Sequence, residues 1–284
     1  MFIAATSIGF KFLGDHINPA QSFFFRNIIA LSLVLVTSKK LTNILQVAKP
    51  KIAMMLLRGT FLSASLLCLF LSFQGLELAT ATAIHFAFIP MASIVTAAAG
   101  SRSGDASFAM LMGIISYVGA LLIIQPQAFS EFEFLAYATS SAIFACTSLL
   151  ILDNLGRSHN PSSITFFLYL AGALLTIPTL PFVWVSPQII DYFIFAGLGI
   201  SGWLSQILLT YAISRTSNLF IAPFQLIVVV FVSIFDLIFW GTSFGWLALL
   251  GMVVIITSTI TNFIKFYSRT MQTKSRNERK WHAT

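Results

Sequence analysis

Long apolar stretches, each followed by a short polar interruption, extend along almost the whole chain. A helix that crosses the hydrocarbon core of a bilayer needs about 20 mainly apolar residues, and most of these stretches approach or exceed that length. The segments are Phe2–Leu13, Ala20–Ser38, Ile52–Leu76, Leu78–Gly100, Ala106–Gln125, Phe132–Leu152, Ser162–Val185, Ile189–Ile213, Ser217–Trp240 and Ser243–Ile264. The pattern therefore predicts an all-α membrane protein with ten transmembrane helices.

The composition excludes most soluble classes of protein. Only 9% of the residues are charged, whereas 57% are hydrophobic, and the mean hydropathy is +0.90. The ratio of hydrophobic to charged residues is higher than the core of a water-soluble protein requires. A secreted enzyme and a disordered chain are therefore both excluded. The net charge of +7 could indicate a nucleic-acid binder. The distribution of the basic residues favours a membrane explanation instead.

The basic residues alternate with the predicted topology. With the N-terminus in the cytoplasm, every Lys and Arg except Lys11, Arg26 and Arg58 falls in a cytoplasmic loop or in the C-terminal tail, and the external loops contain none. The positive-inside rule then places both termini in the cytoplasm. We expect a multi-pass protein of the bacterial inner membrane, with a basic tail at 266–284 that lies over anionic lipid.

An internal repeat divides the chain into two halves. An offset of 142 residues aligns Asn18-Pro19 with Asn160-Pro161, and Leu13-Gly14 with Leu155-Gly156. The sequence therefore predicts one five-helix repeat over 1–126, a second over 127–265 and the tail after them. Because five is odd, the second repeat must cross the membrane in the opposite direction, as in the inverted repeats of secondary transporters.

The repeat also indicates that the first helix is incomplete. The segment Phe2–Leu13 has about twelve residues, or about 18 Å, and cannot span about 30 Å of hydrocarbon. The equivalent helix of the second half begins about ten residues earlier in the repeat. We therefore expect either that the natural chain starts upstream of Met1 or that this copy of the repeat has decayed.

Four ionisable residues within the predicted helices share the outer third of the membrane: Lys11, Arg26, His85 and Asp236. Ionisable groups in the hydrocarbon are unfavourable unless they have a partner, a water-filled cavity or a path to the interface. Lys11 could extend to the interface or pair with Asp15, His85 could be a packing residue, and Asp236 could be an interfacial carboxylate. Their common depth favours a shared substrate site.

Further candidates come from the cytoplasmic third and from the prolines. Arg58 could extend to the interface or act in gating. Pro90 and Pro223 fall in corresponding helices of the two halves, and paired interruptions of this kind often mark a transporter substrate site, although packing kinks are the alternative. Gln225 and Tyr211, near these positions, could supply uncharged substrate contacts.

Enzyme signatures are not found in the sequence. The chain has no His-Glu-x-x-His, Gly-x-Ser-x-Gly, Cys-x-x-Cys or phosphate-binding loop motif. We therefore expect no enzymatic activity, no cofactor and no metal site.

Several short motifs, in their order along the chain, resemble the drug/metabolite transporter superfamily of the EamA type. The motifs are Lys11 to Gly14, Phe24 to Arg26, Leu57 to Gly59, Thr80 to Ala83 with Pro90, Ala222 to Gln225, and Gly251. The pattern looks closest to the branch that contains S-adenosylmethionine uptake carriers. The resemblance implies a central cavity within helices one to four and six to nine, with Lys11, Arg26 and Arg58 facing inward and helices five and ten at the periphery.

The expected function is secondary active transport of a small carboxylate-bearing or zwitterionic metabolite, such as S-adenosylmethionine or an amino acid, by alternating access. In this hypothesis Arg26 and Lys11 contact an anionic group, Asp236 and His85 contact a cationic group or a proton, and Pro90 and Pro223 shape the cavity. The alternatives are a drug/metabolite exporter of broad specificity and a non-transporting degenerate copy. The expected partners are a small-molecule substrate and the lipid bilayer, with no nucleic acid; coupling to a proton or counter-substrate and a homodimer stay open.

Overall fold

The described part of the chain is built from helices. The computed structural model describes residues 2–14, 16–38, 49–98, 104–124, 132–156, 159–215 and 218–281, and these contain no β-strand. The elements are α1 (Phe2–Leu13), α2 (Pro19–Thr37), α4 (Lys49–Ser72), α5 (Leu78–His85), α6 (Phe88–Ala98), α7 (Gly104–Leu121), α8 (Phe132–Gly156), α9 (Pro161–Thr176), the 3₁₀ turn η2 (Ile177–Thr179), α10 (Leu180–Val183), α11 (Ile189–Arg215), α12 (Asn218–Trp240) and α13 (Trp246–Trp281).

Six of the described helical segments are long and apolar enough to cross a membrane. They are Pro19–Thr37, Lys51–Ser72, Phe132–Gly156, Pro161–Val183, Ile189–Arg215 and Trp246–Lys265, and shorter apolar helices cover Phe2–Leu13, Leu78–Ala92, Ser107–Leu121 and Phe224–Trp240. The chain is therefore a multi-pass, all-α membrane protein, as its hydropathy pattern predicts. The segment predicted as one helix over Leu78–Gly100 is divided into α5 and α6.

The helices α2 and α9 begin in the same way, at the two positions that the repeat aligns. Asn18 caps α2 by accepting a hydrogen bond from the backbone N–H of Ala20 at 2.9 Å, and Asn160 caps α9 by accepting one from Ser162 at 3.0 Å. Proline follows in both cases at the first helical position, where its missing N–H is not needed. The repeated Asn-Pro dipeptide thus produces equivalent helix starts.

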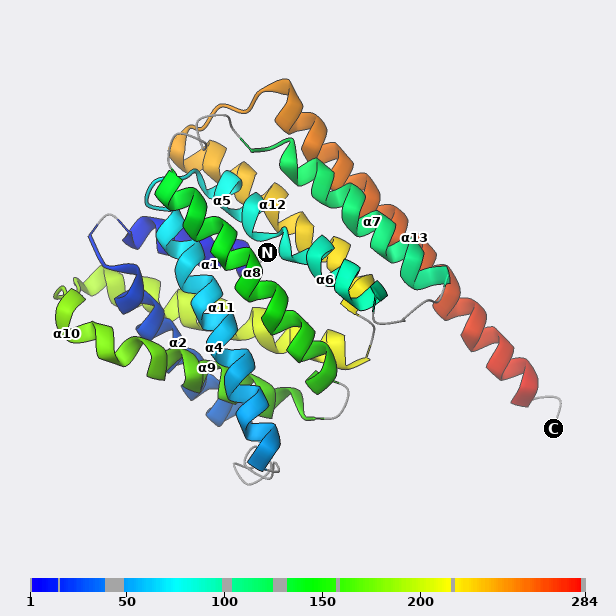
Figure 1. Cartoon of the computed structure of the whole chain (residues 1–284), viewed down its shortest axis with the longest axis horizontal. Helices are drawn as coiled ribbons and strands as arrows, with labels where there is room; N and C mark the ends of the chain where they lie inside the picture. The colour runs from blue at the N-terminus through cyan, green and yellow to red at the C-terminus, as the bar shows by residue number, and fades with distance from the viewer. Residues whose placement is uncertain are drawn as a thin grey trace.

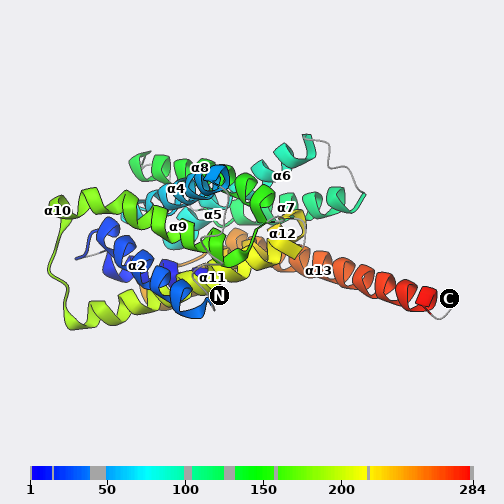
Figure 2. The same cartoon turned by 90° about the horizontal axis from the view of Figure 1, so that it is seen from below.

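The helices pack as a layered bundle (Figure 1). In the view of Figure 2, α4 and α8 form one side, α2 and α11 form the other, and α9 lies between them, in contact with both α4 and α2. The helices α7 and α13 lie side by side along one edge of the bundle, and the end of α13 projects beyond all other helices. This edge position agrees with the peripheral placement that the resemblance implies for helices five and ten.

Glycine permits the close approach of α7 and α13. A Cβ atom on Gly251 would clash with the carbonyl oxygen of Gly119, and a Cβ atom on Gly119 would lie 2.7 Å from the carbonyl oxygen of Gly251. The hydroxyl groups of Ser116 and Ser258 form a buried hydrogen bond across the same contact. Small residues and interhelical hydrogen bonds are typical of helix pairs in membranes.

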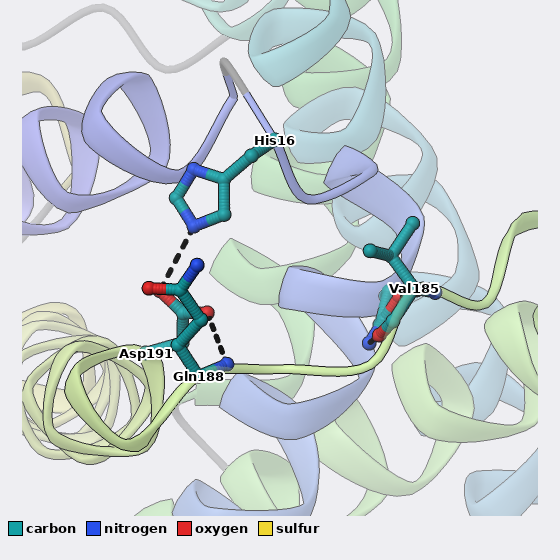
Figure 3. A network of polar contacts seen from close by, with 5 residues as sticks. His16, Val185, Gln188 and Asp191 are labelled. Atoms are coloured by element: carbon teal, nitrogen blue, oxygen red, sulfur yellow. Dashed lines mark hydrogen bonds and ion pairs between the residues drawn. The ribbon is translucent and has the colours of Figure 1, made fainter.

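The α1–α2, α4–α5, α10–α11 and α12–α13 connections lie at one end of the bundle, called here the α1–α2 end (Figure 1). A polar network ties two of these connections together (Figure 3). His16 Nε2 lies 2.9 Å from Asp191 Oδ1, and the other carboxylate oxygen accepts the backbone N–H of Gln188 at 2.7 Å.

The side chain of Gln21 completes this link between the halves. Its amide donates to the carbonyl of Val185 at 2.7 Å and accepts the Val185 N–H at 2.9 Å. The extended segment 184–188 before α11 is therefore held at Val185 by both backbone groups, as a β-strand partner would hold it.

Candidate functional site

A cavity with about 70 Å³ of space for the centres of water-sized molecules lies within the bundle. Its walls come from α1, α2, α4, α5, α6, α8, α11 and α12, and Phe86 between α5 and α6 also contributes. Four of the residues that the sequence nominates line it: Arg26, Arg58, His85 and Gln225. Helices from both predicted repeats thus contribute to one site.

Arg26 extends from α2 toward α11, where Gly202 has no side chain and leaves room for it. Its side chain is only 3% exposed, and a Cβ atom on Gly202 of α11 would lie 2.7 Å from Arg26 Nε. The guanidinium donates to Asn27 Oδ1 at 3.3 Å and lies 5.7 Å from the ring centre of Tyr169. Tyr169 in turn donates from its hydroxyl to the carbonyl of Gly202 at 2.7 Å, so aromatic and backbone groups hold the cation in place.

Arg58 lies on α4 and is 1% exposed. Its guanidinium donates from Nη2 to Gln206 Oε1 at 3.3 Å, while Nε and Nη1 have no hydrogen-bond partner within the described structure. The backbone carbonyl of Arg58 accepts the Ser148 hydroxyl at 3.1 Å. Arg58 therefore faces the cavity, and the alternative in which it extends to the membrane interface is wrong.

His85 lies at the last position of α5. Its Nδ1 is 2.9 Å from the hydroxyl of Ser141, and that hydroxyl donates its hydrogen to the carbonyl of Ala138 at 2.7 Å. Since the Ser141 hydrogen is engaged, Nδ1 donates the hydrogen of that pair. His85 thus combines the packing role with a place in the cavity wall.

The break between α5 and α6 follows from Pro90. A proline cannot donate to the carbonyl four residues before it, which here belongs to Phe86, and the N–H of Ile89 bonds to that carbonyl instead at 3.1 Å. Phe86 and Phe88 beside this break both line the cavity. The paired break expected at Pro223 is not found, because α12 continues from Asn218 to Trp240; a proline removes one backbone bond and need not end a helix.

Lys11 and Asp236 form an ion pair outside the cavity lining. Lys11 Nζ lies 3.2 Å from Asp236 Oδ1, and the second carboxylate oxygen accepts the N–H of Ala79 at 2.7 Å, at the start of α5. Asp236 is fully buried, and Lys11 also lies 4.6 Å from the ring centre of Trp240. Lys11 and Asp236 therefore do not line the cavity with Arg26 and His85, and the expected convergence of these four residues on one site is not found there.

The carboxyl group of Glu77, next to this ion pair, has a raised pKa. Glu77 precedes α5 in its connection to α4, and partial burial together with the nearby charge of Asp236 raises its pKa, while Lys11 opposes the shift. One of its carboxylate oxygens is buried without a hydrogen-bond partner in the described structure. Asp15, the other partner considered for Lys11, lies outside the described residues.

Buried phenylalanines lie between the ion pair and the cavity. The rings of Phe10 and Phe70 stack at 3.5 Å, and Phe23 and Phe73 lie 6.1 and 5.8 Å from Phe70. Along α1 the cavity residues Ile3 to Ser7 come first, then Phe10 and then Lys11. We call these four phenylalanines the aromatic layer; it closes the cavity toward the α1–α2 end.

Tyr211 does not belong to the site. Its side chain is 48% exposed and its ring centre lies 4.5 Å from the guanidinium of Arg215. Tyr169, which is fully buried beside Arg26, was not among the residues that the sequence nominated. A signal was present, since the repeat offset of 142 aligns Tyr169 with Asn27, the residue that accepts a hydrogen bond from Arg26.

Known proteins resemble this chain in sequence. Residues 134–264 match the EamA-like transporter family. The pseudopaline exporter CntI of Pseudomonas aeruginosa (strain UCBPP-PA14) is 26% identical over 85% of this chain and 84% of its own length. The S-adenosylmethionine uptake transporter of Rickettsia bellii is 24% identical over 90% of this chain and 88% of its own length. The matched domain and these relatives support a member of the drug/metabolite transporter superfamily.

A solved structure has the same fold. One solved crystal structure superimposes with a TM-score of 0.70 at 11% identity and covers 93% of this chain and 94% of its own chain. The named relatives are an exporter and an uptake carrier, so the chain is a membrane transporter of a small molecule.

Proposed function

We propose that this protein is a secondary transporter that carries a small carboxylate-bearing metabolite across the bacterial inner membrane by alternating access. One observation carries the proposal: two buried guanidinium groups, those of Arg26 and Arg58, line a single cavity at the centre of a transporter fold. Guanidinium groups bind carboxylates through paired hydrogen bonds, and both groups retain unpartnered N–H donors in the described structure.

The proposed arrangement has two inverted repeats of five helices, over 1–126 and 127–265, and cytoplasmic termini. The positive-inside distribution supports this orientation, which places the α1–α2 end outside the cell. The aromatic layer then separates the cavity from the external side, and the arrangement corresponds to the inward-facing or occluded stage of a transport cycle.

The structure favours an anionic group over a cationic one as the recognised part of the substrate. In the zwitterion hypothesis Asp236 is the counter-ion for a substrate cation. Its two carboxylate oxygens are instead engaged with Lys11 and with the N–H of Ala79. His85 and Gln225 remain as uncharged contacts in the cavity wall, and Arg58 serves as a binding residue in addition to any role in gating.

The test uses the purified full chain in proteoliposomes loaded with radiolabelled S-adenosylmethionine, glutamate or succinate. Arg26→Gln and Arg58→Gln are expected to lower the initial rate for the transported compound at least tenfold, because each removes a charge-assisted carboxylate contact of about 1.5–3 kcal/mol. Arg215→Gln is the matched control, since Arg215 lies over Tyr211 away from the cavity.

Circular dichroism and the elution volume on size exclusion establish that each variant is folded. Wild-type rates in both cavity variants would overturn the proposal. The same conclusion would follow if none of the three compounds crossed the membrane or shifted the melting temperature of the wild-type protein.

A further inference from the structure

The two cavity arginines stand about one helical turn apart. Arg26 packs against Gly202 of α11, and Arg58 bonds to Gln206 of the same helix. Residues four positions apart lie on one face of a helix and are separated by about 6 Å along its axis. The guanidinium groups therefore form a pair of cationic sites at adjacent levels of one wall.

No carboxylate of the protein lies opposite this pair among the described residues. The cavity lining contains Arg26 and Arg58 but neither Asp nor Glu. Asp236 pairs with Lys11, Asp191 bonds to His16 at the α1–α2 end, and Asp153, which follows the lining residue Leu152, is not itself part of the wall. Buried charges are strongly unfavourable without a counter-charge, so both cations require one from the ligand.

The buried atoms of the wall that lack a hydrogen-bond partner in the described structure can all donate hydrogen bonds. The unpartnered buried atoms that line the cavity are Arg26 Nε, Arg58 Nε and Nη1, Gln225 Nε2 and the hydroxyl oxygen of Thr82. The nitrogen atoms can only donate, and the hydroxyl can donate as well. A single carboxylate could reach both levels only by giving one oxygen to each, and it could not form paired hydrogen bonds with both guanidinium groups.

We propose that the substrate of this cavity carries two acidic groups, one for Arg26 and one for Arg58, and is a dicarboxylate rather than a monocarboxylate or a zwitterion. This inference rests on the proposed transport function and specifies its substrate class. The ammonium or sulfonium group of a zwitterion would lie beside two cations, and the fully engaged acid Asp236 is separated from the cavity by the aromatic layer.

The experiment measures binding to the full-length wild-type protein in lipid nanodiscs by isothermal titration. The probes are malonate, succinate, glutarate and adipate, with butyrate as the monocarboxylate, alanine as the zwitterion and inorganic phosphate as the compact anion. We expect at least tenfold tighter binding of one or more dicarboxylates than of butyrate or alanine. The optimum is expected at succinate, glutarate or adipate, and malonate is expected to bind more weakly because its carboxylates are too close.

Variants of Arg58 test whether the second carboxylate of the substrate binds at the level of Arg58. Arg58→Gln is expected to reduce the best dicarboxylate to the affinity of butyrate while changing butyrate binding less than threefold, and Arg58→Lys, which keeps the charge, is expected to retain part of the preference. Arg215→Gln should leave all affinities unchanged. If Arg58→Gln does not fold, Arg58→Lys still tests the level, because loss of paired hydrogen bonding lowers dicarboxylate affinity alone.

Failure of the two-site inference and failure of the transport proposal would give different binding results. Equal binding of butyrate, alanine and the dicarboxylates would overturn the two-site inference and leave the transport proposal standing. Phosphate that binds as tightly as the best dicarboxylate would also overturn it, since the pair would then be a site for one compact anion. No binding of any carboxylate by the folded protein would overturn the proposed function itself.

Discussion

Replacement of Gly202 by alanine tests whether the guanidinium of Arg26 lies where the structure places it. A Cβ atom at this position would meet Nε at 2.7 Å and Cζ and Nη2 at 2.9 Å, whereas ordinary contacts begin near 3.4 Å. The guanidinium would have to move away from α11 within a packed wall. Such overpacking lowers the free energy of unfolding by about 1–3 kcal/mol.

The same substitution at another glycine of α11 is expected to raise the free energy of unfolding instead of lowering it. A Cβ atom on Gly197 would have no neighbouring atom within 4 Å, so Gly197→Ala is expected to raise the free energy of unfolding by about 0.5–1 kcal/mol through helix propensity alone. In an Arg26→Gln background the shorter side chain leaves room at Gly202, and Gly202→Ala should then become neutral or stabilising.

The assay is denaturant titration of the four proteins of the cycle and of the control in mixed micelles, followed by circular dichroism. The expected coupling between Arg26 and Gly202 is about 1–3 kcal/mol, within the range for residues in contact. A Gly202→Ala loss that persists in the Arg26→Gln background would refute the placement, and so would stabilisation equal to that of Gly197→Ala.

The remaining predictions concern groups outside the cavity. Lys11→Met leaves the fully buried Asp236 without its cation and should lower the free energy of unfolding by about 3–5 kcal/mol, whereas the double variant with Asp236→Asn should lose less; equal losses in denaturant titration would contradict the ion pair. Burial and Asp236 raise the pKa of Glu77 above its ordinary 4.5, so the stability from its protonated form is complete below pH 4.5 and is lost as the pH rises through the folded-state pKa. The melting temperature of the wild type relative to Glu77→Gln should therefore fall between pH 4 and 7, and a constant difference would show that the carboxyl is unperturbed. Gly251→Leu should lower the melting temperature by separating α13 from α7, while Gly245→Leu, with open space at its Cβ, should leave it nearly unchanged.

The sequence predicted the helices well because lipid leaves few alternatives. Each backbone polar group must be satisfied within its own helix, so an apolar run of sufficient length has one stable structure. The apolar segments expected from Ala20 and Ser162 begin within one residue of α2 and α9, and the Asn-Pro dipeptides at 18–19 and 160–161 explain both starts, since capping depends on local chemistry.

The candidate site was harder to predict, because counting residues gives depth in the membrane only coarsely and does not specify the face of a helix. Arg26, His85 and Lys11 were assigned similar depths, yet Lys11 lies on the far side of Phe10 from the cavity and pairs with Asp236. Tyr211 is exposed and does not line the cavity. The direction in which a side chain leaves its helix depends on the packing of neighbouring helices, which a single sequence does not contain.

Two fixed positive charges in one cavity also interact with the membrane potential. In a carrier that opens alternately to each side, the potential falls across whichever side is closed, so the cavity passes electrically from one compartment to the other even when its side chains hardly move. Each charge that crosses the field corresponds to about 2.3 kcal/mol per 100 mV, so Arg26 and Arg58 together correspond to about 4.6 kcal/mol. The proposed dianionic substrate would cancel this contribution in the loaded carrier, and the voltage would then act on the return of the empty one.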